Sequence, residues 1–195
     1  GFLTMANTPV DQHYRAAWDE MTGPEAPFGW SVTEVRGVAT RVYNNAPPNM
    51  ALIWAGSIAQ GDNEYLVYGE ESLSYAQVHQ KVDALAAHLS SVGVGHGDRV
   101  AVSMRNYPEW VVTYWATIKI GAALVGMNAW WTTPEMEFGI VDSTPKALVV
   151  DGERLERVAP VLSSLRAENP LLVLVVRSEG DLPEDALHWE DALAT

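Results

Sequence analysis

The sequence predicts an α/β protein with a doubly wound, mostly parallel sheet and flanking helices. Between Ser72 and Asp151, three amphipathic helices are each followed by a short apolar strand. Strands that are apolar on every residue, rather than on alternate residues, are buried on both faces, as parallel strands are. Helical crossovers between such strands form right-handed βαβ units, and an open doubly wound sheet is the simplest architecture that can be built from them.

The three helix–strand pairs have boundaries that can be recognised in the sequence. They are expected at Tyr75–Val92 with Arg99–Met104, at Pro108–Ile120 with Ala123–Met127, and at Thr133–Val141 with Lys146–Val150. Gly93 and Gly121 supply C-terminal caps for the first two helices, and Asn106 and Thr133 are the expected N-caps of the last two.

The chain after Val150 continues the same alternation before it becomes irregular. A helix is predicted at Glu153–Leu165 and a strand at Leu171–Val176. The last stretch, Gly180–Thr195, is acidic and contains Pro183. It is predicted to be a loop with at most one helical turn, because proline and clustered charge disfavour regular structure.

The chain before Ser72 is predicted to contain shorter elements. They are a helix at Pro9–Glu20, an extended segment at Val32–Tyr43, a helix at about Met50–Ala59, and a hairpin formed by Tyr65–Tyr68 and Ser72–Ser74. The valines of the extended segment also have helical spacing, but its β-branched residues and Gly37 favour the extended form. The asparagine and proline run at residues 44–48 separates an N-terminal helix and arm, residues 1–46, from an α/β subdomain, residues 47–195.

Composition and charge narrow the class of protein. The 195 residues are 48% hydrophobic and 19% charged, as is typical of a globular core. A formal net charge of −13 argues against nucleic acid and anionic lipid as partners, because both are bound by basic patches. No apolar run approaches the ~18–20 residues of a transmembrane helix, residues 1–5 lack the pattern of a signal peptide, and cysteine is absent. We therefore expect a cytoplasmic protein, with peripheral attachment to a membrane as the alternative.

The search for catalytic and metal-binding patterns finds none that is convincing. The glycine run at residues 93–97 follows a helix and precedes a strand, whereas a phosphate-binding loop follows a strand and opens a helix. The five histidines lack the spacing of a zinc site, and neither a nucleophile elbow nor a Walker-type loop is present. The sequence therefore predicts no catalytic residue and no metal ligand in this chain.

Binding residues are expected at one end of the sheet, because ligands of open α/β sheets gather outside the carboxyl ends of the strands. Residues 105–107, 128–131 and 151–152 follow three predicted strands. They supply four candidate binding residues, which are Asn106, Asn128, Trp130 and Trp131. Adjacent tryptophans point in different directions unless the loop folds back, so one would be buried and the other would line a surface or a pocket. Packing, an acyl ligand and a neighbouring subunit are the alternatives for the tryptophans, and helix capping is the alternative for Asn106.

Several segments resemble the adenylate-forming (AMP-binding) enzymes, a superfamily that includes the acyl-CoA synthetases. Those segments are Leu73–Val78 (Leu-Thr-Tyr-x-Glu-Leu in the family), Gly93–Val102 (Gly-Val-x-x-Gly-Asp-x-Val-Ala), Asn106–Trp110 (Asn-x-x-Glu-Phe/Trp) and Ile118–Asn128 (Leu-Lys-x-Gly-Ala, then Pro-Leu-Asn). The match runs in order from about Pro47 to Val176. It departs from the family at Gly126 and Met127, where proline and an aliphatic residue are usual.

The resemblance implies the N-terminal part of the large domain of an acyl-CoA synthetase. Such an enzyme activates a carboxylic acid with ATP and Mg²⁺ to an acyl-adenylate, releases pyrophosphate, and transfers the acyl group to coenzyme A. Asn128 resembles the CoA-ligase branch and Trp130–Trp131 resemble fatty-acid-activating members, which implies a fatty acid as the substrate. The implied partners are the remainder of the large domain, a mobile C-terminal domain and, as a further option, a second subunit in a homodimer.

The parts of that family that perform catalysis do not match these residues. The phosphate loop that is rich in glycine, serine and threonine and ends in lysine does not occur in the sequence, and neither do the later motifs. We therefore expect the chain alone to be inactive and to bind no ATP, Mg²⁺ or CoA. One alternative is a fatty-acyl-AMP ligase or a peptide-synthetase adenylation domain. The other is a truncated paralogue that serves as a dimerisation or regulatory module.

Overall fold

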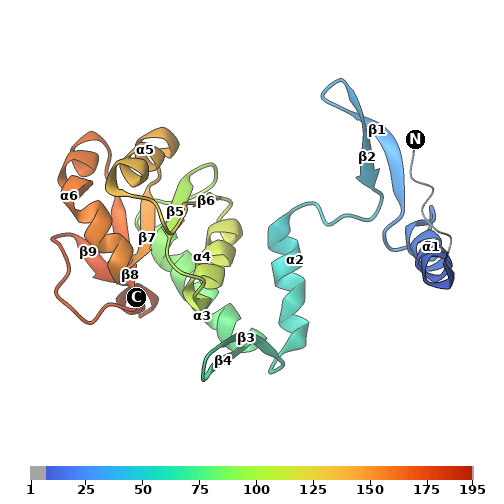
Figure 1. Ribbon diagram of the computed structural model, residues 1–195, viewed down its shortest axis with the longest axis horizontal. Coiled ribbons are helices and arrows are strands. Elements are labelled where there is room, and N and C mark those ends of the chain that lie inside the picture. The colour runs from blue at the N-terminus through green and yellow to red at the C-terminus, as the bar shows by residue number, and fades with distance from the viewer. Residues whose placement is uncertain (1–7, 195) are drawn as a thin grey trace. The chain divides into compact units, whose positions relative to one another are not determined.

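The computed structural model describes residues 8–194, which fall into two compact units divided between Asn49 and Met50. Each unit is described by itself. The first contains one helix and two strands, which are α1 (Pro9–Thr22), β1 (Trp30–Val35) and β2 (Val38–Tyr43) (Figure 1). The predicted helix of this region is thus present and extends slightly beyond Glu20.

Helix α1 begins with a capping box. The Thr8 hydroxyl accepts a hydrogen bond from the Asp11 N–H at 3.2 Å, and the Asp11 carboxylate accepts one from the Thr8 N–H at 3.0 Å. Two of the free N–H groups at the helix N-terminus are satisfied in this way. The Thr8 hydroxyl also donates to the Asp11 carboxylate at 2.6 Å, and this hydrogen bond, followed by the one from the Thr8 N–H, holds the pKa of the Asp11 carboxyl below its ordinary value.

The segment predicted as one extended stretch at Val32–Tyr43 is a hairpin. Strands β1 and β2 pair antiparallel, and the turn between them has positive φ at Arg36 (51°) and Gly37 (80°). Positive φ at both central residues is the geometry of a type I′ turn, which matches the twist of the flanking strands. The prediction recognised the extended backbone but missed its reversal, because arginine is an unusual residue for the first of these positions.

The second unit contains all the other elements. They are α2 (Met50–Gly56), the 3-10 helix η1 (Ser57–Gln60), β3 (Glu64–Tyr68), β4 (Glu71–Ser74), α3 (Tyr75–Ser91), β5 (Arg99–Ser103), α4 (Pro108–Lys119), β6 (Ala123–Gly126), α5 (Thr133–Ser143), β7 (Ala147–Asp151), α6 (Gly152–Glu168), β8 (Leu172–Val176), β9 (Ala186–His188) and α7 (Trp189–Leu193). Strands β3 and β4 form the predicted hairpin, and β5 to β9 form a five-stranded sheet in the order β6-β5-β7-β8-β9.

The five-stranded sheet is the middle layer of three. All of its neighbouring strands are parallel. Alternate residues of β5 enter different cores: Val100 and Val102 pack with α3 and α4, and Ala101 packs with α5 and α6. Helices on both faces of a parallel sheet define the doubly wound α/β class, so the predicted fold class is confirmed (Figure 1).

Strand β6 differs from the other predicted strands. Strands β5, β7 and β8 are almost completely buried, whereas Ala123 and Gly126 of β6 are exposed. The expectation that every one of these strands is buried on both faces is therefore wrong for β6. It forms one edge of the sheet in the described chain, so β5 covers only one of its sides.

The end of the chain is more regular than predicted. Residues 186–193 form β9 and α7, where a loop with at most one helical turn was expected; the five-residue α7 fits that turn, whereas β9 was not predicted. Trp189 is only 3% exposed, and Trp189 and Ala192 belong to the core that α3 and α4 cover. Burial of this tryptophan outweighs the local signals of acidity and Pro183, and it helps to place the unpredicted strand β9 next to β8.

The helix boundaries agree with the predictions to within a few residues, with two corrections at the caps. Thr132 rather than Thr133 is the N-cap of α5, and its capping box includes Glu135. Tyr107 rather than Asn106 is the N-cap of α4, because Pro108 occupies the first helical turn. None of the helices in the described part of the chain is long and apolar enough to cross a membrane.

Candidate functional site

The candidate site lies where the strand order of the sheet reverses, between the neighbouring strands β5 and β7. After β5 the chain passes through α4 to β6, which lies on one side of β5. After β7, which lies on the other side of β5, it passes through α6 to β8, farther away in that direction. Helices α4 and α6 pack on opposite faces of the sheet. In such a sheet, ligands bind outside the carboxyl ends of the two strands where the order reverses.

Asp151 joins the loops at this position. It ends β7, is 4% exposed, and its carboxylate accepts hydrogen bonds from the N–H of Arg105 at 3.1 Å and of Arg154 at 3.0 Å. The Arg154 guanidinium also forms an ion pair with this carboxylate at 3.1 Å, and both side chains are buried. Asp151 thus caps α6 and holds the loop that follows β5, and it is already engaged by several donors.

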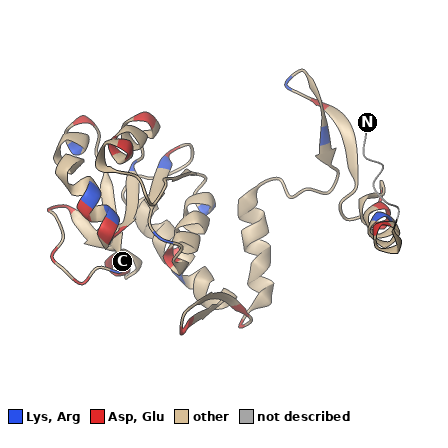
Figure 2. Ribbon diagram, in the orientation of Figure 1, with Lys and Arg blue, Asp and Glu red and all other residues tan. Residues whose placement is uncertain are grey.

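Two arginines of α6 hold the loop that carries the tryptophans. Arg154 Nε donates to the Ala129 carbonyl at 2.7 Å, and Arg157 Nη1 donates to the carbonyls of Ala129 and Trp131 at 3.1 Å each. Within the loop, Asn128 Oδ1 accepts a hydrogen bond from the Trp130 N–H at 2.9 Å. Side-chain donors and one side-chain acceptor therefore satisfy backbone groups that no strand partner reaches. Figure 2 shows that α6 carries basic as well as acidic residues.

The adjacent tryptophans have different surroundings. Trp130 is 67% exposed, and the Arg105 guanidinium lies 4.9 Å from the centre of its ring. Trp131 is partly buried and packs against Gly139, where an added Cβ would lie only 2.8 Å from the Trp131 ring. The pair is thus divided into one exposed and one partly buried tryptophan, whereas one fully buried tryptophan was expected.

The candidate residue Asn106 directly precedes Tyr107, the N-cap of α4, and lines the same cavity as Trp130. A shallow open cavity of about 300 Å³ lies at the carboxyl ends of the strands, and it is lined by Tyr68, Met104, Arg105, Asn106, Ala129 and Trp130. Of the four candidate residues, Asn106 and Trp130 are therefore brought together. Asn128 and Trp131 do not line this cavity; they shape the loop that positions Trp130.

A second network borders the same cavity. Arg177, at the end of β8, pairs with Glu71 at 2.7 Å and Glu109 at 3.0 Å, and its guanidinium lies over the rings of Tyr68 and Tyr107. The hydrogen bonds that the Arg177 guanidinium donates to the Glu71 carboxylate raise the pKa of Arg177, and the same contact lowers the pKa of the Glu71 carboxyl. Burial, followed by the charge of Asp151, raises the pKa of the Tyr107 hydroxyl. The Tyr107 hydroxyl is therefore neutral near pH 7.

The groups around this cavity are suited to binding a ligand rather than to catalysing a reaction. The exposed Arg105 guanidinium and the Trp130 ring offer a cation and an aromatic face, which suit an anionic ligand with a planar or apolar part. The described residues contain no cluster of three side chains that could hold a metal ion. The sequence analysis did not anticipate Arg154 and Arg157, although an Asp–x–x–Arg pattern at a helix start is a readable signal of such a pair.

Known proteins resemble this chain in sequence and in fold. A family model described as "AMP-binding enzyme" matches residues 56–194, which is most of the chain. The chain belongs to the AMP-binding enzyme family. One relative is a medium/long-chain-fatty-acid–CoA/3-oxocholest-4-en-26-oate–CoA ligase of Mycobacterium marinum, 37% identical over 120 residues, which are 62% of this chain and 22% of the ligase. Another is a 3-hydroxybenzoate–CoA/4-hydroxybenzoate–CoA ligase of Thauera aromatica, 30% identical over 63% of this chain and 23% of that enzyme.

Solved structures of the family share the fold. The anthranilate CoA ligase AuaEII in complex with anthranoyl-AMP superposes with a TM-score of 0.68 at 24% identity, over 75% of this chain and 28% of the ligase. A mutant form of the coronafacic acid ligase of Pectobacterium brasiliense gives a TM-score of 0.68 at 21% identity, over 75% of this chain and 29% of that enzyme. The chain spans about a fifth of the length of the curated relatives it matches.

Proposed function

We propose that the chain serves as the N-terminal part of an acyl-CoA synthetase that uses ATP, Mg²⁺ and CoA. The enzyme would activate a carboxylic acid to an acyl-adenylate and transfer the acyl group to CoA. The observation that carries this proposal is the 37% identity over 120 residues to a ligase named for medium- and long-chain fatty acids. That relative also supports an aliphatic, fatty acid as the substrate class.

These residues alone are proposed to be inactive. They correspond to 22% of the length of that ligase, and their candidate site consists of a shallow cavity with no arranged nucleophile, acid or base. The remainder of the large domain and a mobile C-terminal domain are the proposed intramolecular partners, and the whole enzyme is proposed to be cytoplasmic. The basic and aromatic groups at the carboxyl ends of the strands fit an anionic cofactor, whereas no described set of residues fits Mg²⁺.

Within this enzyme, Asn106 and Trp130 are proposed to contact a ligand. Trp130 exposes its ring next to the Arg105 guanidinium, and Asn106 lines the same cavity. Asn128 and Trp131 act indirectly: Asn128 holds the backbone of Trp130, and Trp131 fixes the loop against α5. Substitution of Trp130 should therefore weaken binding without unfolding the protein.

The test begins with the gene beyond the codon for Thr195. If the reading frame continues, the whole protein is assayed for the CoA thioester with acetate, a medium-chain and a long-chain fatty acid, and benzoate. We expect ATP- and CoA-dependent thioester formation that favours the fatty acids, and no acid-dependent ATP–pyrophosphate exchange by the 195-residue chain. Exchange by that chain would contradict its proposed inactivity.

Two results would replace this proposal. Adenylate formation without a CoA thioester would indicate a fatty-acyl-AMP ligase or a peptide-synthetase adenylation domain. A stop codon directly after Thr195 would favour a dimerisation or regulatory module. For the site, Trp130→Ala in the whole enzyme should raise the KM of one substrate about tenfold, a change of about 1.4 kcal/mol. Phe138→Ala, also at an exposed aromatic residue (71% exposed), is the matched control and should leave KM unchanged.

A further inference from the structure

The tip of the β3–β4 hairpin borders the candidate site, although this hairpin is not part of the five-stranded sheet. Tyr68 ends β3, pairs with Glu71 across the turn, and lines the cavity that Asn106 and Trp130 also line. An isolated two-stranded hairpin is marginally stable in water. The position of this cavity wall therefore depends on what holds residues 68–71, named here the hairpin tip.

Packing against the core of the second unit holds the other end of the hairpin. Trp115 Nε1 donates a hydrogen bond to the Tyr65 hydroxyl at 3.0 Å. Leu66 and Leu73 pack against the core that α3 and α4 cover. All four residues of the hairpin tip are exposed, with Tyr68 at 41%, and none of them belongs to that core. Burial therefore fixes the base of the hairpin and leaves the tip to other contacts.

Arg177 attaches the hairpin tip to the sheet. Its guanidinium donates two hydrogen bonds to the Glu71 carboxylate, at 2.9 Å from Nη1 and 2.7 Å from Nη2. Its Nε donates to Oε2 of Glu109, in the first turn of α4, at 3.1 Å. The same guanidinium lies 4.9 Å from the centre of the Tyr68 ring and 4.7 Å from that of Tyr107. One side chain thus joins the tip to the end of β8 and to the start of α4.

This set of contacts requires an arginine. A planar guanidinium can bind a carboxylate through two N–H groups and stack on aromatic rings at the same time, whereas the ammonium group of lysine is a compact point charge. The Tyr68 and Tyr107 rings also meet edge to face, with their centres 5.4 Å apart. The orientation of the Tyr68 ring therefore depends on the guanidinium as well as on Tyr107.

The backbone of Arg177 is unusual as well. Its φ is 51°, in the left-handed region that residues with a side chain rarely adopt. Such conformations persist where surrounding contacts hold them, and they cluster at binding sites. Arg177 directly follows Val176 of β8, which pairs with Asp151 at the end of β7. The strained residue thus lies at the carboxyl ends of the strands, where the candidate site lies.

The charges around Arg177 make it a poor ligand for an anion. Its guanidinium faces two carboxylates, those of Glu71 and Glu109, so negative charge is in excess around it. Arg105 lines the cavity and has no ion pair within the described part of the chain. Arg105 is therefore the cation that a ligand can reach, and Arg177 is already committed to the hairpin tip and to α4.

We propose that Arg177 is a positioning residue of the candidate site. It holds the hairpin tip so that the Tyr68 ring forms a wall of the cavity and contacts the same ligand as Asn106 and Trp130. Arg177 itself touches no ligand and acts through Tyr68. This inference rests on the proposed function, because it needs a ligand in that cavity. It adds Tyr68 to the residues that determine which ligand the cavity accepts.

Steady-state kinetics of the whole enzyme test the role of Arg177. Tyr68→Ala and Arg177→Lys should each raise the KM of the same substrate, by about tenfold and about fivefold, with kcat nearly unchanged; residues in one contact network have effects of this size. The double variant should have no higher KM than Tyr68→Ala, because Arg177 acts through that ring. If the two increases multiply in the double variant, Arg177 acts independently of Tyr68 and the proposal is wrong.

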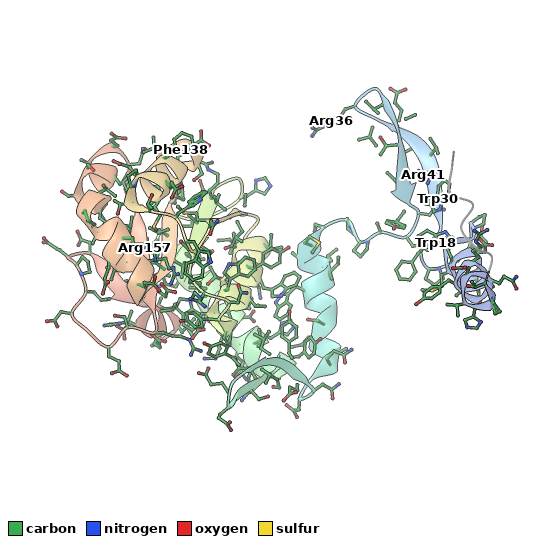
Figure 3. The ribbon with its side chains drawn as sticks, in the orientation of Figure 1. Trp18, Trp30, Arg36, Arg41, Phe138 and Arg157 are labelled. Atoms are coloured by element: carbon green, nitrogen blue, oxygen red, sulfur yellow. The ribbon has the colours of Figure 1, made fainter. Side chains whose placement is uncertain are left out.

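Two matched controls separate this effect from a general loss of stability. Arg166→Lys changes an arginine of α6 that donates to the carbonyl of Asp185, which precedes β9 at the amino ends of the strands. Phe138→Ala removes an exposed ring from α5, which packs on the other face of the sheet (Figure 3). Both variants should leave KM unchanged. A rise in KM in Arg166→Lys equal to that in Arg177→Lys would show that the effect is not specific to the hairpin tip.

Fluorine NMR of the 195-residue chain tests the position of the hairpin tip without any activity. When the seven tyrosines are replaced by 3-fluorotyrosine, the Tyr68 signal is identified by its absence from Tyr68→Phe. Arg177→Lys should move this signal toward that of free 3-fluorotyrosine, and Arg166→Lys should not. Glu71→Gln is a second, milder variant at an exposed residue, and it should move the signal in the same direction.

The two experiments distinguish failure of this inference from failure of the proposed function. An unchanged Tyr68 signal in both Arg177→Lys and Glu71→Gln overturns the positioning role, whatever the whole enzyme does. If the signal moves but the whole enzyme forms no CoA thioester, the proposed function fails and the hold of Arg177 on Tyr68 is still supported.

Discussion

The two units of this chain hold regular structure in different ways. In the second unit, which begins at Met50 and is called the αβα unit below, β5, β7 and β8 are almost entirely buried and two layers of helices cover the sheet. In the N-terminal unit, the helix and the hairpin rest on a capping box and strand pairing, and almost every side chain is exposed. Local hydrogen bonds are thus enough to define elements, but burial supplies the free energy that stabilises a domain.

The largest change in the free energy of unfolding should come from breaking the buried Arg154–Asp151 ion pair of the αβα unit. Arg154→Ala leaves the Asp151 carboxylate buried without its guanidinium, which should lower the free energy of unfolding by about 3–5 kcal/mol. Urea unfolding of the chain measures this change. Lys119→Ala removes a partner of the exposed Lys119–Asp83 pair and should cost less than about 1 kcal/mol. Equal costs for the two variants would show that burial does not set the difference.

Apolar burial in the central strand should rank next. Leu148 is fully buried in β7, so Leu148→Ala should lower the free energy of unfolding by about 2–5 kcal/mol through lost burial and a residual cavity. Leu52→Ala is the matched control in α2, where the leucine is 52% exposed, and its effect should stay within about 0.5 kcal/mol. A small effect of Leu148→Ala would mean that the sheet is not the stabilising core.

The same capping motif in both units sharpens the comparison. Ser74 caps α3 in the αβα unit as Thr8 caps α1 in the N-terminal unit, each with a reciprocal side-chain hydrogen bond. Ser74→Ala should lower the unfolding free energy of the αβα unit by about 1 kcal/mol. Thr8→Ala should reduce the helical circular dichroism signal and leave that main transition in place. If Thr8→Ala shifted the main transition by as much, the two units would be unfolding together.

The smallest expected effect is a dependence on acidic pH. Hydrogen bonds from Lys146 and from the Gly95 N–H lower the pKa of the Asp98 carboxyl below its ordinary value of 3.8. A lowered pKa in the folded state contributes stability that is complete above the ordinary value and is lost as the pH falls through the folded value. The difference in unfolding free energy between wild type and Asp98→Asn should therefore be constant near neutral pH and shrink below about pH 4. If the difference in unfolding free energy stayed constant down to pH 2, the proposed contribution of the Asp98 carboxylate to stability would be wrong.

Much of the fold was predictable because its strands are uniformly apolar. The runs that became β5, β7 and β8 could be assigned to a buried parallel sheet from residue type alone. The position of β6 at an edge could not, because it depends on the side of β5 to which each crossover returns. Strand β9 was missed because its pairing with β8 and the burial of the adjacent Trp189 are tertiary effects that no local pattern reveals.

The candidate site was predictable in position and only partly in composition. Strand ends located the loops that carry Asn106 and Trp130, since topology alone brings the carboxyl ends of parallel strands together. The contact of Arg177 with Glu71 joins residues 106 positions apart in the chain, and nothing in the sequence links them. Whether Trp130 or Trp131 would be exposed also depended on packing, in this case on the closeness of Trp131 to Gly139.

The uncovered strand β6 has a consequence for how the longer enzyme that we propose is made. Each crossover helix of the αβα unit joins strands that are near one another in the sequence, so this unit can fold while the ribosome is still adding later residues. At roughly 5–20 residues per second, the remaining four-fifths of such a protein would emerge over tens of seconds. During that time β6 would present a free apolar edge to chaperones and to other nascent chains.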